Sequence, residues 1–371
     1  MSITFIAAEL LKAVNACRGV VETRNTIPIL SCVVIRSITG AEATVEATNL
    51  DQTLTWRLPC SGAGSFVVPF TMLREIVRHL GPGEMVRIGD APDNRVRIDF
   101  GDGRASLMTL PVNDWPDLGT FEEISARVSM PVSSLADLVP FISREETRYY
   151  LNGVFVDVGI ETVRTVATNG HTLGLIREAA TRECDGDGDG GGFIVPRHAV
   201  EWLAKHVGAE RLAVDLNAAK ARFHGPQFEL TTKLIDGRYP DWQRVVPKPE
   251  EPILMEVDAA GFGRKLARLR AVGTPYCGVS YDGRRIAATS RGPDGETISL
   301  AVGGKAPKPF ELTFQSTLMS DALAFVGGQV TVKAAGAGSP FRIEGDGLRV
   351  GIVMPTRSGE LRHDLPEDIA A

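Results

Sequence analysis

Cysteine is scarce in this 371-residue chain, and its pattern excludes two common ways of stabilising a small fold. The five cysteines are odd in number, scattered and never spaced as CxxC; they are Cys17, Cys32, Cys60, Cys184 and Cys277. Neither a structural zinc site nor a disulfide framework is therefore expected. This cysteine usage fits a protein of the reducing cytoplasm.

Long apolar runs and a leader sequence are missing too. No apolar run reaches the roughly 18 residues that a membrane span needs, and the N-terminus shows no basic region followed by an apolar stretch, so no secretion signal is expected. A net charge of −6 argues against coating nucleic acid with the whole surface, but it leaves room for a basic patch. The length predicts two or three domains.

Motifs for catalysis, phosphate binding and metal binding are lacking as well. There is no GxxxxGK[ST] loop. Asp185 to Gly190 resembles the start of a calcium loop, but the glutamate of the twelfth position would fall at Pro196, so an acidic loop is predicted. His171 follows Asn169 without a recognisable nucleophile and base, which favours a turn or groove histidine. A β-rich hydrolase or transferase remains an alternative that these residues do not favour.

What the chain does contain is a segment that recurs three times, from Phe66 to Gly81, from Phe193 to Gly208 and from Leu312 to Gly327. Each copy has an apolar strand, apolar residues spaced i, i+3, i+4, i+7, and a glycine. This spacing predicts an amphipathic helix with one buried face and the glycine at its C-cap. The predicted buried positions are Leu73, Ile76, Val77 and Leu80, then Val200, Leu203, Ala204 and Val207, then Met319, Ala322, Leu323 and Val326.

Three further segments recur in the same order. The apolar pairs Leu10/Val14, Leu135/Val139 and Phe262/Leu266 predict a helix that opens each unit. A strand is then predicted to end in Ala47-Thr48-Asn49, in Ala167-Thr168-Asn169 and in Ala288-Thr289-Ser290. An aromatic-Pro-Asp turn starts a linker at 115–117 and at 239–241, and the third unit offers only Met354-Pro355.

These recurrences predict an α+β fold with three homologous domains, at residues 1–120, 121–249 and 250–359. A tail over 360–371 is rich in charge, and we expect it to be disordered. Each domain is expected to place two helices on one face of an antiparallel sheet. Three such units side by side form a curved body, which a second copy can close into a ring.

Basic residues recur on the predicted helices of this acidic protein. Any one of them has an ordinary explanation as a solvated surface residue, but a helix-lined face of that sign would bind phosphates without sequence specificity. The last predicted helix has no basic residue and carries Asp321. The basic residues are Lys12, Arg18, Arg74, Arg78, His79, Arg197, His198, Lys205, His206, Arg264, Lys265, Arg268 and Arg270.

Six stretches, in this order and spacing, resemble the bacterial DNA polymerase III beta subunit, the sliding clamp. They are Thr26–Leu30, Arg148–Gly153, Thr165–His171, Ile194–Arg197, Lys233–Asp241 and Val353–Pro355. The resemblance implies a non-catalytic, three-domain subunit without a cofactor or metal, which dimerises head to tail into a ring around duplex DNA. It also implies a cytoplasmic, nucleoid-associated location. The implied partners are double-stranded DNA, the polymerase catalytic subunit, an ATP-dependent clamp loader and other proteins with a clamp-binding motif.

The resemblance also implies two sites. A hydrophobic groove between domains two and three receives a short peptide from each partner. Its residues here are Leu151, Thr168, Gly170, His171, Thr172, Leu173, Pro240, Arg244, Val245, Ile352, Val353, Met354 and Pro355. The residues expected near DNA are Arg24, Arg148, Tyr149, Tyr150 and Arg197, to which the basic helix faces add Arg74, Arg78 and His198. For Tyr149 and Tyr150, packing in a core or an interface is the alternative.

Two features depart from the family pattern. Thr172 stands where the family usually has a basic residue after the groove histidine, and the chain continues beyond Met354-Pro355 to Ala371. Both leave the peptide preference of the groove open. A specialised clamp paralogue, carried on a mobile element or tolerant of an inhibitor, therefore remains an alternative.

Overall fold

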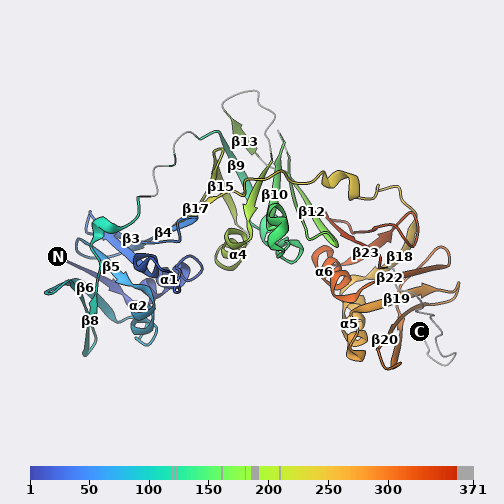
Figure 1. Ribbon diagram of the computed structural model, residues 1–371, viewed down its shortest axis with the longest axis horizontal. Helices are drawn as coiled ribbons and strands as arrows, with labels where there is room; N and C mark the ends of the chain where they lie inside the picture. Colours follow the sequence, from blue (N-terminus) through green and yellow to red (C-terminus); the bar gives the residue numbers. More distant parts are fainter. Residues whose placement is uncertain are drawn as a thin grey trace. The chain divides into compact units, whose positions relative to one another are not determined.

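The computed structural model describes residues 1–117, 121, 124–159, 162–179, 181–184, 192–208 and 210–356. The acidic loop expected at 185–190 and the tail expected at 360–371 lie outside the described residues. The chain divides into two compact units, and Figure 1 labels many of their helices and strands. The first unit comprises Met1–Val132, Arg182–Asp187 and Glu201–Leu234, and the second comprises Ser133–Thr181, Gly188–Val200 and Ile235–Ala371.

The first unit contains a nine-stranded sheet in the order β13-β9-β15-β16-β17-β4-β3-β2-β5. Strands of two sequence repeats meet where β4 pairs antiparallel with β17, with Thr53 opposite Thr231. Backbone pairing thus continues from one repeat into the next. The strands are β2 (Cys32–Ser37), β3 (Glu42–Thr48), β4 (Gln52–Pro59), β5 (Gly64–Pro69), β9 (Ala126–Pro131), β13 (Thr181–Cys184), β15 (Arg211–Leu216), β16 (Lys220–His224) and β17 (Phe228–Lys233).

A four-stranded antiparallel sheet, β1-β6-β7-β8, completes the strands of the first unit. Its strands are β1 (Ser2–Ile6), β6 (Met85–Ala91), β7 (Arg95–Phe100) and β8 (Gly103–Met108). The helices α1 (Ala7–Cys17) and α2 (Phe70–Val77) contact each other, and each buries one apolar face, with Leu10, Val14, Leu73 and Val77 fully covered. Short 3₁₀ turns lie at η1 (Pro28–Ser31) and η2 (Val112–Asp114).

The second unit contains an eight-stranded sheet in the order β14-β10-β11-β12-β25-β24-β23-β18. Here strands of the second and third repeats meet, where β12 pairs antiparallel with β25. The strands are β10 (Gly153–Val158), β11 (Thr162–Thr168), β12 (Thr172–Ala179), β14 (Phe193–Pro196), β18 (Ile253–Asp258), β23 (Gln329–Lys333), β24 (Phe341–Glu344) and β25 (Arg349–Val353).

The second unit also has a four-stranded sheet, β21-β20-β19-β22, and two long helices that contact each other. The strands are β19 (Tyr276–Tyr281), β20 (Ile286–Arg291), β21 (Thr297–Val302) and β22 (Phe310–Gln315), and the helices are α5 (Ala259–Leu269) and α6 (Ser316–Val326). The remaining helical segments are α3 (Ser133–Ala136), α4 (Arg197–His206), η3 (Val139–Phe141), η4 (Glu146–Leu151), η5 (Trp242–Val245) and η6 (Arg270–Val272). Within the described part of the chain, no helix is long and apolar enough to cross a membrane.

Most predicted elements are present, and four details were wrong. The helix predicted around Leu135 and Val139 is only four residues long, because Pro140 lacks the N–H that a further turn needs. Ala204 is exposed on α4, whose buried face includes Trp202 instead. Gly81 lies beyond the C-cap of α2 at Arg78. The third repeated strand continues past Ser290 to Arg291. By contrast, α6 spans Ser316–Val326 and ends at Gly327, which is its C-cap as predicted and has φ 70°.

Candidate functional site

A tight turn between β11 and β12 forms one end of an apolar groove in the second unit. The Asn169 side-chain oxygen accepts backbone N–H bonds from His171 and Thr172, both at 2.9 Å. The Thr168 hydroxyl donates to the Thr172 carbonyl at 2.7 Å and accepts from the Gly170 N–H at 3.1 Å. Gly170 has φ +89°, which an L side chain rarely adopts. The turn thereby leaves the His171 side chain exposed at the edge of the groove.

The floor of this groove is the seam between β12 and β25. Leu173 lies opposite Ile352 in the antiparallel register, and both side chains are 2% exposed. After β25 ends, the Met354 N–H donates to the His171 carbonyl at 2.9 Å, so Met354 lies beside the turn. Its side chain is 39% exposed. A buried aliphatic floor with one accessible methionine is suited to an apolar side chain of a ligand.

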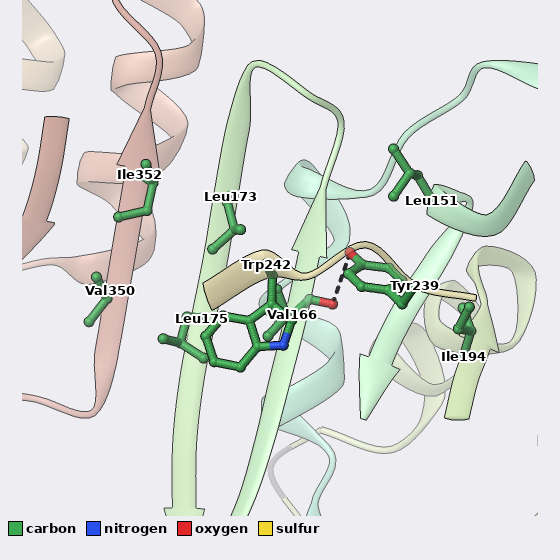
Figure 2. Packing of buried hydrophobic residues seen from close by; sticks show 9 residues of the cluster. All are labelled: Leu151, Val166, Leu173, Leu175, Ile194, Tyr239, Trp242, Val350 and Ile352. Atoms are coloured by element: carbon green, nitrogen blue, oxygen red, sulfur yellow. Dashed lines mark hydrogen bonds between the residues drawn. The ribbon is translucent and has the colours of Figure 1, made fainter. Parts of the chain in front are cut away.

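The linker after the second repeat forms a wall of the groove (Figure 2). Tyr239 is buried, stacks on Phe155 with ring centroids 4.8 Å apart, and donates its hydroxyl to the Val166 carbonyl at 3.5 Å. Burial raises the pKa of its phenol well above the usual range. Trp242, at the start of η5, belongs to the same core cluster as Leu173 and Ile352. These aromatic anchors fix the linker against the sheet.

Charged groups at the rim are paired locally. Arg148 makes two hydrogen bonds to Glu145, of 2.7 and 2.5 Å, which lower the pKa of that carboxyl. Arg244 lies 2.8 Å from Asp241 in an ion pair between two exposed side chains. Thr172, which follows the groove histidine, is buried and hydrogen-bonded to Asn169. The groove therefore combines an apolar floor with a rim of paired charges.

The structure brings ten of the thirteen predicted groove residues around one cavity of about 270 Å³. Arg244, Val353 and Pro355 do not line it. Arg148 and Tyr150, predicted near DNA, do line it, and the prediction missed Asp241 and Trp242. Trp242 directly follows the recognised Tyr-Pro-Asp turn, so its apolar side chain was the available signal. The lining residues are Arg148, Tyr150, Leu151, Thr168, Gly170, His171, Thr172, Leu173, Pro240, Asp241, Trp242, Val245, Ile352 and Met354.

The residues predicted near DNA have varied surroundings. Arg24 is exposed in the loop before η1. On α2, Arg74 donates to the Asn15 side chain at 3.0 Å, and Arg78 lies 3.0 Å from Glu75. Arg197 donates to the backbone carbonyls of Ile142 and Ser143, so this guanidinium supports a loop. His198 and Tyr149 are exposed, and Tyr149 packs edge-on against Tyr150.

Comparison with known proteins gives consistent matches. Residues 1–119 match the family described as DNA polymerase III beta subunit, N-terminal domain, and residues 133–241 match its central domain. The beta sliding clamp of Caulobacter vibrioides is 32% identical over 358 residues, which cover 92% of this chain and 95% of that protein. The beta sliding clamp of Pseudomonas putida is 31% identical over 266 residues, covering 69% of this chain and 70% of that protein.

Solved structures of sliding clamps have the same fold as this chain. The crystal structure of a sliding clamp from Bartonella birtlesii bound to griselimycin has a TM-score of 0.88 and 27% identity, covering 96% of this chain and 100% of that chain. A sliding clamp from Pseudomonas aeruginosa, also bound to griselimycin, has a TM-score of 0.88 and 26% identity, with the same coverage.

Proposed function

This chain belongs to the DNA polymerase III beta subunit family, the beta sliding clamps, and we infer that it encircles duplex DNA and tethers the replicative polymerase to it. The observation that carries the inference is the 32% identity to the Caulobacter clamp, which spans 95% of that protein. Membership makes the chain a processivity factor of DNA replication and not an enzyme. The relatives named above are described as sliding clamps, so nothing favours a specialised paralogue.

The ring requires two chains with three clamp domains each. We place the domain boundaries near residues 120 and 249, within the linkers that begin at the two aromatic-Pro-Asp turns, and the end of the third domain near 359. The proposed function implies four kinds of partner. They are duplex DNA, bound without sequence specificity, the polymerase catalytic subunit, an ATP-dependent clamp loader and other proteins with a clamp-binding motif. The cytoplasm, at the nucleoid, is the corresponding location.

The apolar groove of the second unit is the proposed site for the partner peptide. Three features support this role: the buried Leu173–Ile352 floor, the accessible Met354 and the aromatic wall at Trp242. Arg148 and Tyr150 belong to this site by position, since they line its cavity. For DNA contact we retain Arg24, Arg74, Arg78, Tyr149 and His198, while Arg197 acts through the loop whose carbonyls it binds.

The test is a pair of charged substitutions in the groove, Val245→Glu with Met354→Glu, since both residues line the cavity and are 49% and 39% exposed. Anchors in desolvated pockets contribute at least about 2 kcal/mol, so affinity for the polymerase catalytic subunit should fall by roughly 30-fold or more. Isothermal titration calorimetry measures this affinity. Leu348→Glu is the matched control, because Leu348 is 55% exposed in the same unit but does not line the groove.

Circular dichroism and light scattering should show that both variants keep the fold and the dimer. If the double variant binds the polymerase as tightly as the control does, the peptide site lies elsewhere.

A further inference from the structure

The first unit contains a second hollow that is built like the apolar groove. Its turn, between β3 and β4, repeats the same hydrogen bonds: the Asn49 side-chain oxygen accepts from the N–H groups of Asp51 at 3.2 Å and Gln52 at 2.7 Å. The Thr48 hydroxyl donates to the Gln52 carbonyl at 3.0 Å and accepts from the Leu50 N–H at 3.0 Å. Each bond has its counterpart in the turn at 168–172, so Leu50 corresponds to Gly170 and Asp51 to His171.

The strand seam also corresponds position by position. Thr53 lies opposite Thr231 between β4 and β17, as Leu173 lies opposite Ile352 in the groove. The Lys233 N–H donates to the Asp51 carbonyl at 2.8 Å, as the Met354 N–H does to the His171 carbonyl. Lys233 is therefore the counterpart of Met354.

The linker wall is repeated as well. Trp115, from the first aromatic-Pro-Asp turn, is 7% exposed and packs in a cluster with Leu30 and Val67. Tyr239 occupies the equivalent place in the second unit, in a cluster with Leu151 and Ile194. The indole N–H of Trp115 donates to the side chain of Glu46.

Side-chain chemistry is where the two hollows differ. The floor residues Leu173 and Ile352 are replaced by Thr53 and Thr231, and Met354 is replaced by Lys233. The ammonium of Lys233 lies 2.7 Å from the carboxylate of Asp51, with side chains 54% and 64% exposed. The hollow, of about 670 Å³, is lined by Arg36, Glu46, Leu50, Asp51, Thr53, Thr55, Trp115, Pro116, Asp117, Phe121, Lys220, Arg222, Glu229, Thr231 and Lys233.

We propose that Asp51, Thr53, Thr231 and Lys233 exclude the apolar partner peptide from this second hollow, so that each chain offers a single peptide site. An apolar peptide here would strip water from the exposed ion pair of Lys233 and Asp51, and it would cover the Thr231 hydroxyl without offering it a hydrogen bond. The Thr53 hydroxyl keeps its hydrogen bond of 3.2 Å with Thr48, but its polar group still makes the floor less apolar than that of the groove. The same peptide in the groove covers the apolar side chains of Val245 and Met354, which are 49% and 39% exposed and whose removal from water is favourable. The two hollows share one backbone arrangement, so the peptide's preference for the groove comes from unfavourable contacts in the second hollow. The inference rests on the proposed peptide-binding role of the groove.

The experiment transplants the groove residues into the second hollow. The starting protein carries Val245→Glu and Met354→Glu, which disable the groove, and receives Asp51→His, Thr53→Leu, Thr231→Ile and Lys233→Met. The probe is a synthetic peptide copied from the clamp-binding segment of the host polymerase, and binding is measured by calorimetry. Recovery of affinity by at least about tenfold over the disabled protein is expected. The control adds Lys308→Met alone, since Lys308 is exposed and lines neither hollow.

A folded transplant that binds no better than the control would overturn the inference. A second measurement does not depend on the transplant: the unmodified protein should bind one peptide per chain, and occupancy of two equivalent sites would equally overturn it. Failure of the unmodified protein to bind any peptide would instead contradict the proposed function of the groove.

Discussion

Gly170 and Leu50 occupy the same position in two turns of the same construction, and both have positive φ, 89° and 73° respectively. For a residue with a Cβ, this conformation costs roughly 1 kcal/mol relative to glycine. A Cβ on Gly170 would also come within 2.7 Å of Arg148 Nη1, which would have to move from the rim of the groove. The polar hollow thus tolerates a conformational strain that the apolar groove avoids.

Exchanges between glycine and alanine test this argument at both positions. Gly170→Ala should lower the free energy of unfolding by about 1 kcal/mol, and Leu50→Ala should be less stable than Leu50→Gly by a similar amount. Because both Leu50 variants remove the same apolar side chain, their difference isolates the backbone. Urea denaturation followed by circular dichroism gives the values. Equal stability of the two Leu50 variants would show that the turn relaxes without strain.

At the scale of elements, α1 ends in a way that depends on a residue far along the chain. The last carbonyls of a helix have no partner within it, and the last turn of α1 contains no basic side chain. The indole N–H of Trp202, from α4, donates to the Ala16 carbonyl at 2.8 Å. Trp202 is 3% exposed and lies edge-on to Phe228, with ring centroids 5.0 Å apart. It therefore caps α1 and fills the adjoining core.

Trp202→Phe should keep much of the packing and remove only the cap. The Ala16 carbonyl would then be buried without this donor, so the free energy of unfolding should fall by about 1–3 kcal/mol. Trp202→Ala should cost more, about 3–5 kcal/mol, because it also leaves a cavity. Chemical denaturation of the three proteins separates the two contributions. If Trp202→Phe is as stable as the unmodified protein, the hydrogen bond adds nothing to the packing.

The same residue shows how far the sequence could predict the elements. Apolar spacing located the long helices, since burial of one face dictates that spacing. The same spacing wrongly assigned Ala204 to the buried face of α4. It contains no information on the hydrogen bond that Trp202 donates to a carbonyl of another helix. Arg342, in the alternating strand β24, is 4% exposed and donates to Glu344 and to the Pro247 carbonyl. Such partners are invisible to periodicity.

Prediction of the groove residues required more than hydrophobic periodicity. Its floor residues were found through resemblance to a family, whereas Trp242 and Asp241 were missed because no recognised motif contains them. Pairing of β12 with β25, and of β4 with β17, joins strands from different repeats. Register between distant strands depends on long-range packing that a single sequence does not display. The correspondence of the two hollows became visible only when both registers were known.

At the scale of the whole molecule, a clamp of this family holds DNA by enclosing it, so binding need not depend on strong local contacts. The net charge of −6 is compatible with binding by enclosure. A protein that is held on DNA only by phosphate contacts would bind more strongly with a net positive charge. Contacts with phosphates weaken steeply as salt concentration rises. A topological link does not weaken in that way, so salt can distinguish the two modes of retention.

The prediction concerns the full-length protein, loaded onto a nicked circular plasmid by the clamp loader and ATP. Light scattering should first give a mass of twice 39.9 kDa, since a single chain cannot close the ring. After loading, a wash at high salt should leave the protein on the circular DNA in gel filtration. A closed ring cannot leave this DNA, because the circle has no end from which the ring could slide off. Cutting the same plasmid once with a restriction enzyme should release it, since the ring then slides off. An uncut plasmid treated with inactivated enzyme is the control. Equal retention on cut and uncut plasmids, or loss from both in high salt, would mean that local contacts and not enclosure hold the protein on DNA.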